Sequence, residues 1–226
     1  MARIARVIVE GYAHHITQRG NRRLQTFFNE EDYAEYLRLM AEWLTKRDVS
    51  VWAYCLMPNH VHLLVVPATE DGLRRGIGEA HRRYSRRINF REGWRGHLWQ
   101  GRFSSFILDD DHMLAAARYI ERNPVAAGLV EAPWDYPWSS ARAHLEGRDD
   151  ILVRVQPLLE IVEDWRDFIG QETTKEIVRT IQQHERTGRP LGDEAFVDAL
   201  EQKTRRDLRR KKTGPKGPRR KNQEER

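Results

Sequence analysis

The chain has 226 residues, of which 39% are hydrophobic and 32% are charged, and its formal net charge is +5. This length and apolar content suit one domain of ordinary size plus an appendage. The longest apolar run, residues 63–68, is too short to span a membrane, and the chain starts with an alternating pattern rather than a signal-peptide core. We therefore expect a cytoplasmic protein with no membrane partner. The single cysteine, Cys55, excludes an internal disulfide and a cysteine-based zinc finger.

Apolar spacing along the first half of the chain predicts a mixture of strands and helices. The expected elements, in chain order, are strands at 3–9 and 12–17, a helix after the N-cap Asn29, a strand hairpin at 51–66, a helix after Thr69, a strand at 98–108 and a helix from Asp109 to Pro124. This order indicates an α+β fold with helices packed on one face of a sheet.

The character of the chain changes after residue 145. Helical patterns recur around residues 158–168, 175–184 and 193–208. The last stretch is rich in Gly, Pro and cations and has no apolar residue to bury. We expect one domain at 1–145, a helical extension at 146–210 and a basic flexible tail at 211–226 that contacts nucleic acid nonspecifically.

Positive charge is concentrated in two blocks. Residues 73–103 hold nine Arg against two Glu, and residues 204–226 hold eleven Arg or Lys against three acids. The first block also carries the rings of Tyr84, Phe90, Trp94, Trp99 and Phe103. Interleaved guanidinium groups and rings suit a single nucleic-acid strand, whose phosphates and bases they contact, whereas a solvated basic helix is the ordinary alternative.

The strand hairpin carries two histidines on one face. Side chains alternate along a strand, so His60 and His62 project to the same side together with Leu64. A His-x-His pair is common on strands that bind no metal, so a further group has to complete a metal site. Tyr119 and Asn123 are the candidates, because four-residue spacing puts a phenol and an amide on one face of a helix. The alternative is a half-buried core tyrosine and a helix-terminating asparagine.

Two ordered motifs carry a resemblance to a known family. The motifs are Pro58-Asn59-His60-Val61-His62-Leu63 and Tyr119-Ile120-Glu121-Arg122-Asn123-Pro124-Val125. They resemble the single-tyrosine HUH transposases, and most closely the REP-associated tyrosine transposases, which are domesticated relatives in bacterial chromosomes. Blocks at residues 15–21, 98–103 and 134–140 agree, so the resemblance covers residues 1–145 well and the rest loosely.

The resemblance implies a ferredoxin-like core with a central antiparallel sheet. It also implies a metal-dependent endonuclease and strand transferase that acts on single-stranded DNA folded into REP-type hairpins. His60 and His62 would hold Mg²⁺ or Mn²⁺, which neutralises charge on the phosphodiester while Tyr119 attacks it. The attack would leave a 5′-phosphotyrosine and a free 3′-hydroxyl. A phenol has a reference pKa near ~10, so Tyr119 needs activation by the metal, a base or a water.

The sequence offers more than one candidate for the third metal ligand. Related transposases carry Gln four residues after the nucleophile, and here Asn123 is one methylene shorter. His15 and Gln18, at the end of an early strand, are alternative sources of the ligand. Imidazole and amide donors suit Mn²⁺ somewhat better than Mg²⁺, whereas availability in the cell favours Mg²⁺, so both stay open.

Single-stranded or hairpin DNA is the expected partner, bound by a monomer or a homodimer. The residues expected to contact DNA are Arg19, Arg22, Arg74, Arg75, Arg82, Arg83, Arg86, Gln100 and Arg102. The alternative function is a noncatalytic nucleic-acid-binding regulator derived from a transposase, which metal titration at His60 and His62 would separate from the enzyme. A metal hydrolase of small phosphoesters is disfavoured because it leaves the basic blocks unexplained.

Overall fold

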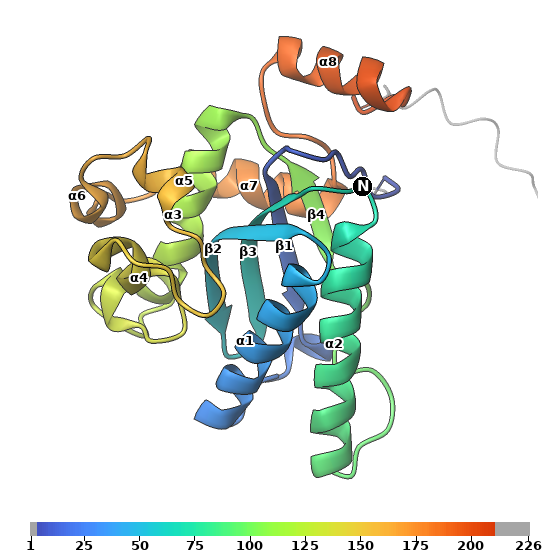
Figure 1. The fold of residues 1–226 in the computed structure, drawn as a ribbon, viewed down its shortest axis with the longest axis vertical. Helices are drawn as coiled ribbons and strands as arrows, with labels where there is room; N and C mark the ends of the chain where they lie inside the picture. Colours follow the sequence, from blue (N-terminus) through green and yellow to red (C-terminus); the bar gives the residue numbers. More distant parts are fainter. Residues whose placement is uncertain (1–3, 211–226) are drawn as a thin grey trace, which may run out of the picture.

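The computed structural model describes residues 4–210, and a four-stranded antiparallel sheet forms its centre (Figure 1). The strands, in chain order, are β1 (His14–Arg19), β2 (Val49–Met57), β3 (His60–Pro67) and β4 (Ser104–Ile107). Their order in the sheet is β2-β3-β1-β4, so β1 lies between the histidine-bearing strand and β4. The predicted tail at 211–226 lies outside the described residues.

Helices account for most of the remaining chain. They are α1 (Glu30–Thr45), α2 (Gly72–Arg91), α3 (Asp110–Ala126), α4 (Ala141–Glu146), α5 (Gln156–Leu159), α6 (Trp165–Gly170), α7 (Lys175–Thr187) and α8 (Glu194–Thr204), with 3-10 turns at Asn21–Arg23 and Pro133–Asp135. Asn29 caps α1 as predicted, because its side chain accepts a hydrogen bond from the backbone N–H of Asp32. The α+β class is confirmed. None of the helices in residues 4–210 is long and apolar enough to cross a membrane.

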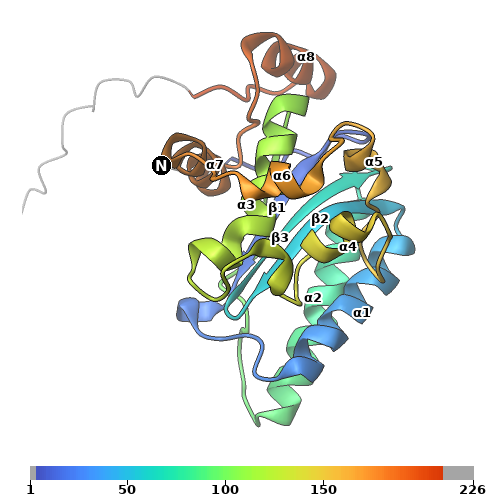
Figure 2. The ribbon, with the colours of Figure 1, turned by 90° about the vertical axis from the view of Figure 1, so that its left-hand side faces the viewer.

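Helices cover both faces of the sheet, which corrects the expectation of one covered face. Val61, Leu63 and Val65 belong to the core formed with α1 and α2, whereas Leu64 and Cys55 belong to the core formed with α3. Figure 2 shows α3 on the opposite side of the sheet from α1 and α2. Since β2 and β3 are apolar on both faces, each face needs a cover. His60 and His62, on the Leu64 face, therefore face α3.

The N-terminal segment also differs from its prediction. Residues 4–9 form no strand in the structure. Val7 and Val9 instead pack in a small core with Ile107 and with Leu200 of α8. The alternating pattern thus reflects burial of one side of an extended segment, which is the same pattern that a strand produces.

Two element ends differ as well. The strand predicted at 98–108 is limited to the four residues of β4. Helix α3 continues to Ala126 with Pro124 inside its last turn. Proline removes one backbone hydrogen bond from the helix. Because this loss falls near the end of a helix that packs on the sheet, the helix continues past Pro124.

The extension folds back onto the α3 face of the sheet. Leu158, Trp165, Ile169 and Ile181 are buried in the same core as α3. After α7, Leu191 pairs in parallel with Leu108 at the end of β4. The extension therefore shares the core of the sheet, and α7 lies against β4 and β1.

Candidate active site

A cleft of about 580 Å³ opens at the end of β1 and β3 on the α3 side of the sheet. Its wall includes Tyr119 from α3 and Glu185 from α7, together with His60. Four arginines also line it: Arg19, Arg23, Arg102 and Arg186. This concentration of guanidinium groups favours an anionic ligand, and phosphate is one of the two anionic groups that arginine binds through paired hydrogen bonds.

Tyr119 is held against the histidines by the packing of α3. Ala116, Ala117 and Ile120 are fully buried against the sheet, which fixes the helix and leaves the tyrosine ring at the edge of the core. The ring of Tyr119 meets that of His62 edge-on, with centroids 5.5 Å apart and planes at 87°. Its centroid lies 6.0 Å from that of His15. The structure thus brings the predicted nucleophile to the predicted histidine face.

The phenol of Tyr119 is hard to ionise without help. Burial, followed by the nearby negative charge of Glu185, raises the pKa of Tyr119 to about 12, although hydrogen bonds with Gln182 and Asn123 act in the opposite direction. Since the pKa lies far above neutral pH, deprotonation of the Tyr119 oxygen needs a positive charge or a base beside it.

His15, His62 and Glu185 form a compact group of metal-ligand type. The Nε2 atom of His15 lies 3.0 Å from Nδ1 of His62, and Oε1 of Glu185 lies 3.9 Å from the first and 3.7 Å from the second. These are residues of β1, β3 and α7. Among the residues that the structure describes, this is the one group of at least three His, Cys, Asp or Glu side chains with donor atoms within 4.8 Å of one another.

Burial keeps the imidazoles of this group neutral. It lowers the pKa of His15 to about 3 and the pKa of His62 well below its usual value, where His60, His15 and Arg19 add to the effect. Burial raises the pKa of Glu185 to about 7, against the charges of Arg19 and Arg186. Neutral imidazole is the form that binds a metal. Two imidazole nitrogens and a carboxylate oxygen therefore fit a divalent ion such as Mn²⁺.

The other two predicted metal ligands are placed differently. His60 lies beside His62, with ring centroids 4.9 Å apart, and its Nδ1 is 2.6 Å from the side-chain oxygen of Asn59. Burial, then the charge of Arg19, lowers the pKa of His60 to about 4. Asn123 donates its side-chain N–H to the carbonyl of Tyr119 at 2.8 Å, and it does not line the cleft.

Sequence reasoning missed the residues that α7 contributes. Gln182, Glu185 and Arg186 line the cleft and follow three- and four-residue spacing, so they share one face of the helix. That spacing was visible in the sequence. Nothing in the sequence indicates that this face meets β1 and β3, because the packing of α7 depends on a return of the chain to the sheet.

The residues predicted to contact DNA fall into two sets. Arg19, Gln100 and Arg102 line the cleft. The others lie outside it: Arg22 in the first 3-10 turn, and Arg74, Arg75, Arg82, Arg83 and Arg86 along the exposed side of α2. Arg82 and Arg83 both pair with Glu79, and Arg74 and Arg75 both pair with Asp71. Exposed pairs of this kind are weak, so the arginines remain available to a phosphate backbone.

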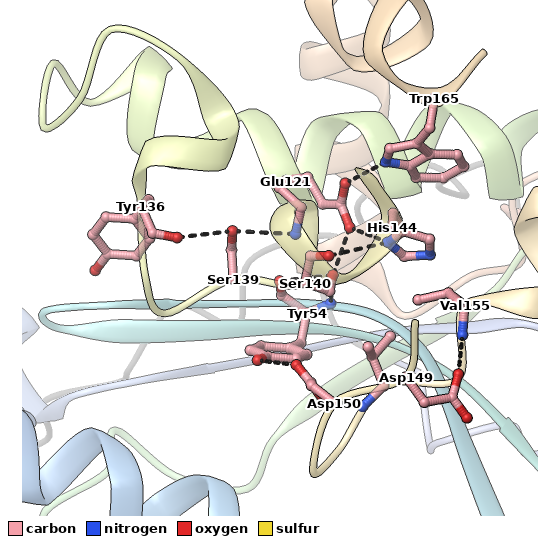
Figure 3. Close-up of polar contacts among 12 residues, drawn as sticks. Tyr54, Glu121, Tyr136, Ser139, Ser140, His144, Asp149, Asp150, Val155 and Trp165 are labelled. Carbon is pink, nitrogen blue, oxygen red and sulfur yellow. Dashed lines mark hydrogen bonds and ion pairs between the residues drawn. The ribbon is translucent and has the colours of Figure 1, made fainter. Parts of the chain in front are cut away.

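A second histidine and glutamate cluster anchors α3 (Figure 3). Glu121 is fully buried; its Oε1 accepts hydrogen bonds from Ser140 Oγ at 2.5 Å and His144 Nδ1 at 2.7 Å, and its Oε2 accepts one from Trp165 Nε1 at 2.9 Å. Ser140 Oγ in turn accepts from the N–H of Tyr54 on β2 at 2.8 Å. The cluster ties the helix that carries Tyr119 to the sheet and to α6.

Comparison with known proteins assigns the chain to a family. The family model for IS200-like transposases matches residues 8–123, just over half of the chain. The chain belongs to the IS200-like transposase family. The match includes His15, His60, His62, Tyr119 and Asn123, and it ends before the extension.

Individual relatives point in the same direction. The chain is similar to a Haemophilus influenzae protein provisionally named a REP-associated tyrosine transposase, with 30% identity over 124 residues. That match covers 50% of this chain and 64% of the relative, so the chain spans about two-thirds of that protein's length. A solved structure of a REP-associated tyrosine transposase bound to a REP hairpin matches with a TM-score of 0.56 and 22% identity. The match covers 67% of this chain and 90% of the solved structure, and it supports the fold.

Proposed function

We propose that this protein cleaves and rejoins single-stranded DNA beside REP-type hairpins, with Tyr119 as the nucleophile and a divalent cation, Mg²⁺ or Mn²⁺, held by the histidines that face it. His60 and His62 are the ligands predicted from the sequence. Membership of the IS200-like transposase family and the similarity to REP-associated tyrosine transposases support the reaction class and the hairpin substrate.

The observation that carries the proposal is the position of Tyr119. Its ring stands edge-on to His62 at 5.5 Å, at the wall of a cleft that is lined by four arginines. A phosphodiester held by Arg19 and Arg102 would lie in this cleft beside the phenol of Tyr119 and the ring of His60. This arrangement holds a nucleophile, donors for a cation and groups that bind phosphate within one cleft.

The reaction follows from this arrangement. The Tyr119 phenol gives its proton to a base or water as its oxygen attacks phosphorus in line. The P–O3′ bond breaks, the 3′-oxygen takes up a proton from solvent and leaves as a 3′-hydroxyl, and the 5′-phosphate stays on the tyrosine. A bound divalent cation would neutralise the charge that develops on the phosphate oxygens. Arg19, Arg102 and Arg186 orient the phosphates of the strand. Another 3′-hydroxyl can reverse the step, because the phosphotyrosine ester retains the bond energy, and this reversal joins strands without ATP.

The test is formation of a covalent adduct. Purified protein incubated with Mn²⁺ and DNA hairpins that carry single-stranded flanks is expected to form a protein–DNA species that survives denaturing electrophoresis. The Tyr119→Phe variant is expected to bind the hairpin and form no adduct, and the Tyr12→Phe variant to behave as wild type. An adduct that persists in Tyr119→Phe would contradict the nucleophile. Hairpin binding by the wild type with no adduct and no bound cation would favour the noncatalytic regulator.

A further inference from the structure

We infer that Glu185 of α7 is a ligand of the divalent cation, together with His62 and His15, so that the helical extension completes the active site. This inference rests on the metal dependence proposed above and adds His15 and Glu185 to the donors named there. It assigns to the extension a role within the site, beyond the region that the family model matches.

The distances among the three donor atoms suit one ion. The triangle formed by His15 Nε2, His62 Nδ1 and Glu185 Oε1 has sides of 3.0, 3.9 and 3.7 Å. A point at the centre of this triangle is about 2.1 Å from all three atoms, which is the length of a bond from nitrogen or oxygen to a first-row divalent metal. The donors therefore need little movement to share an ion.

The two imidazole nitrogens of this triangle hydrogen-bond to each other, whereas the carboxylate oxygen stands apart. Oε1 of Glu185 is buried and has no hydrogen-bond partner in the part of the chain that the structure describes. A buried carboxylate oxygen without a partner is costly, and a bound cation removes that cost.

The position of Glu185 is fixed by its own helix. Ile181 is buried one turn earlier, in the core shared with α3. The carbonyl of Glu185 accepts a hydrogen bond from Ser104 Oγ of β4 at 2.5 Å. A ligand held on a packed helix keeps its geometry.

Asn123 is a poorer candidate for the third ligand. Its side-chain N–H donates to the carbonyl of Tyr119, one turn back on the same helix. The same side chain also hydrogen-bonds the Tyr119 phenol, and it is one methylene shorter than the Gln of related transposases. Glu185 approaches the same histidines from α7 and supplies a negatively charged oxygen.

The test is a titration of the full chain with Mn²⁺ in the absence of DNA. Electron paramagnetic resonance measures the concentration of free Mn²⁺ at each step. Glu185→Gln keeps the shape of the side chain and is expected to raise the dissociation constant by about 10- to 100-fold. His15→Gln, on a different element, is expected to cause a similar loss. Asn123→Ala and Glu176→Gln are expected to match wild type, because the first side chain contacts its own helix and the second is exposed in the first turn of α7.

Several results would overturn the inference. Wild-type affinity in a folded Glu185→Gln variant, with its melting temperature retained, would exclude the carboxylate as a ligand, and so would a loss confined to Asn123→Ala. Failure of the wild type to bind Mn²⁺ would also contradict it. Mn²⁺ binding is measured without DNA, so it is independent of adduct formation. If Glu185→Gln loses Mn²⁺ binding but the wild type forms no adduct with DNA, the proposed function is refuted and this inference stands.

Discussion

Two buried clusters of histidine and glutamate contact α3, and they differ in how their polar atoms are satisfied. In the cluster around Glu121, both carboxylate oxygens accept hydrogen bonds, and within residues 4–210 only His144 Nε2 lacks a partner. In the group of His15, His62 and Glu185, each residue keeps one buried polar atom without a partner. Hydrogen bonds to both carboxylate oxygens fit the role of a structural anchor for the first cluster, whereas the unpartnered carboxylate oxygen of the second fits the cation site proposed above.

Replacement of His62 should produce the largest effect. His62 belongs both to the pair predicted from the sequence and to the group with Glu185. His62→Ala is expected to abolish detectable Mn²⁺ binding and adduct formation, because it removes the donor that both arrangements share. Replacement of the exposed His97 by alanine is the matched control and should change neither quantity. Normal Mn²⁺ binding by His62→Ala would place the ion elsewhere.

Replacement of Glu121 should affect folding instead. Glu121→Ala leaves Ser140, His144 and Trp165 without their shared acceptor in the core, so the free energy of unfolding should fall by about 3–5 kcal/mol. Urea denaturation measures this loss. Glu176→Ala, on the exposed side of α7, should stay within about 0.5 kcal/mol of wild type. A folded Glu121→Ala variant with unchanged stability but no Mn²⁺ binding would reverse the roles of the two clusters.

Another buried histidine, His81, lies outside both clusters and affects how stability depends on pH. Its Nε2 lies 2.8 Å from the hydroxyl of Tyr36, and burial, then the charge of Arg6, lowers the pKa of His81 to about 3. The unfolded chain binds a proton here below about pH 6.5 and the folded chain does not, so stability present above pH 6.5 is lost as the pH falls toward 3. His81→Gln removes this group. Between pH 6 and 4, the free energy of unfolding of the variant should therefore fall less steeply than that of wild type, by about 1.4 kcal/mol per pH unit. Parallel pH curves for the two proteins would show that His81 is not buried as a neutral group.

The smallest expected effect concerns single arginines of the cleft. Arg102→Ala should weaken hairpin binding and lower the slope of log K against log salt by about 0.7–0.9, the share of one phosphate contact. Fluorescence anisotropy at several salt concentrations measures this slope. The exposed Arg148, which pairs with Glu146 in the extension, provides a control whose replacement should leave the slope unchanged. Equal effects at both positions would mean that the cleft does not hold the strand.

Local pattern was enough to predict the sheet face of the histidines and the helix that carries Tyr119. Strand alternation fixes His60 and His62 on one side, and helical spacing fixes the face of α3. The place of His15 was not predictable in this way. It depends on the pairing of β1 with β3, in which His15 is opposite Leu64 and thus diagonal to His62. Glu185 depends on the return of α7 to the sheet, and no local signal encodes that packing.

Helices were predicted on one face of the sheet, whereas they cover both faces, and this difference has a physical reason. The order of strands and helices does not say on which side each helix packs. The apolar residues of β2 and β3 on both faces carried that information, since a sheet with two apolar faces needs two covers.

The central claim is that the Tyr119 oxygen bonds to DNA phosphorus at the histidine face. Mass spectrometry of tryptic peptides after incubation with Mn²⁺ and hairpin DNA tests it most directly. Trypsin cleaves after Arg118 and Arg122, so Tyr119 falls in the peptide Tyr-Ile-Glu-Arg, in which it is the one hydroxyl-bearing residue. We expect this peptide to carry the phosphodiester-linked nucleotides. Nucleotides on any other peptide, with Tyr119 unmodified, would contradict it.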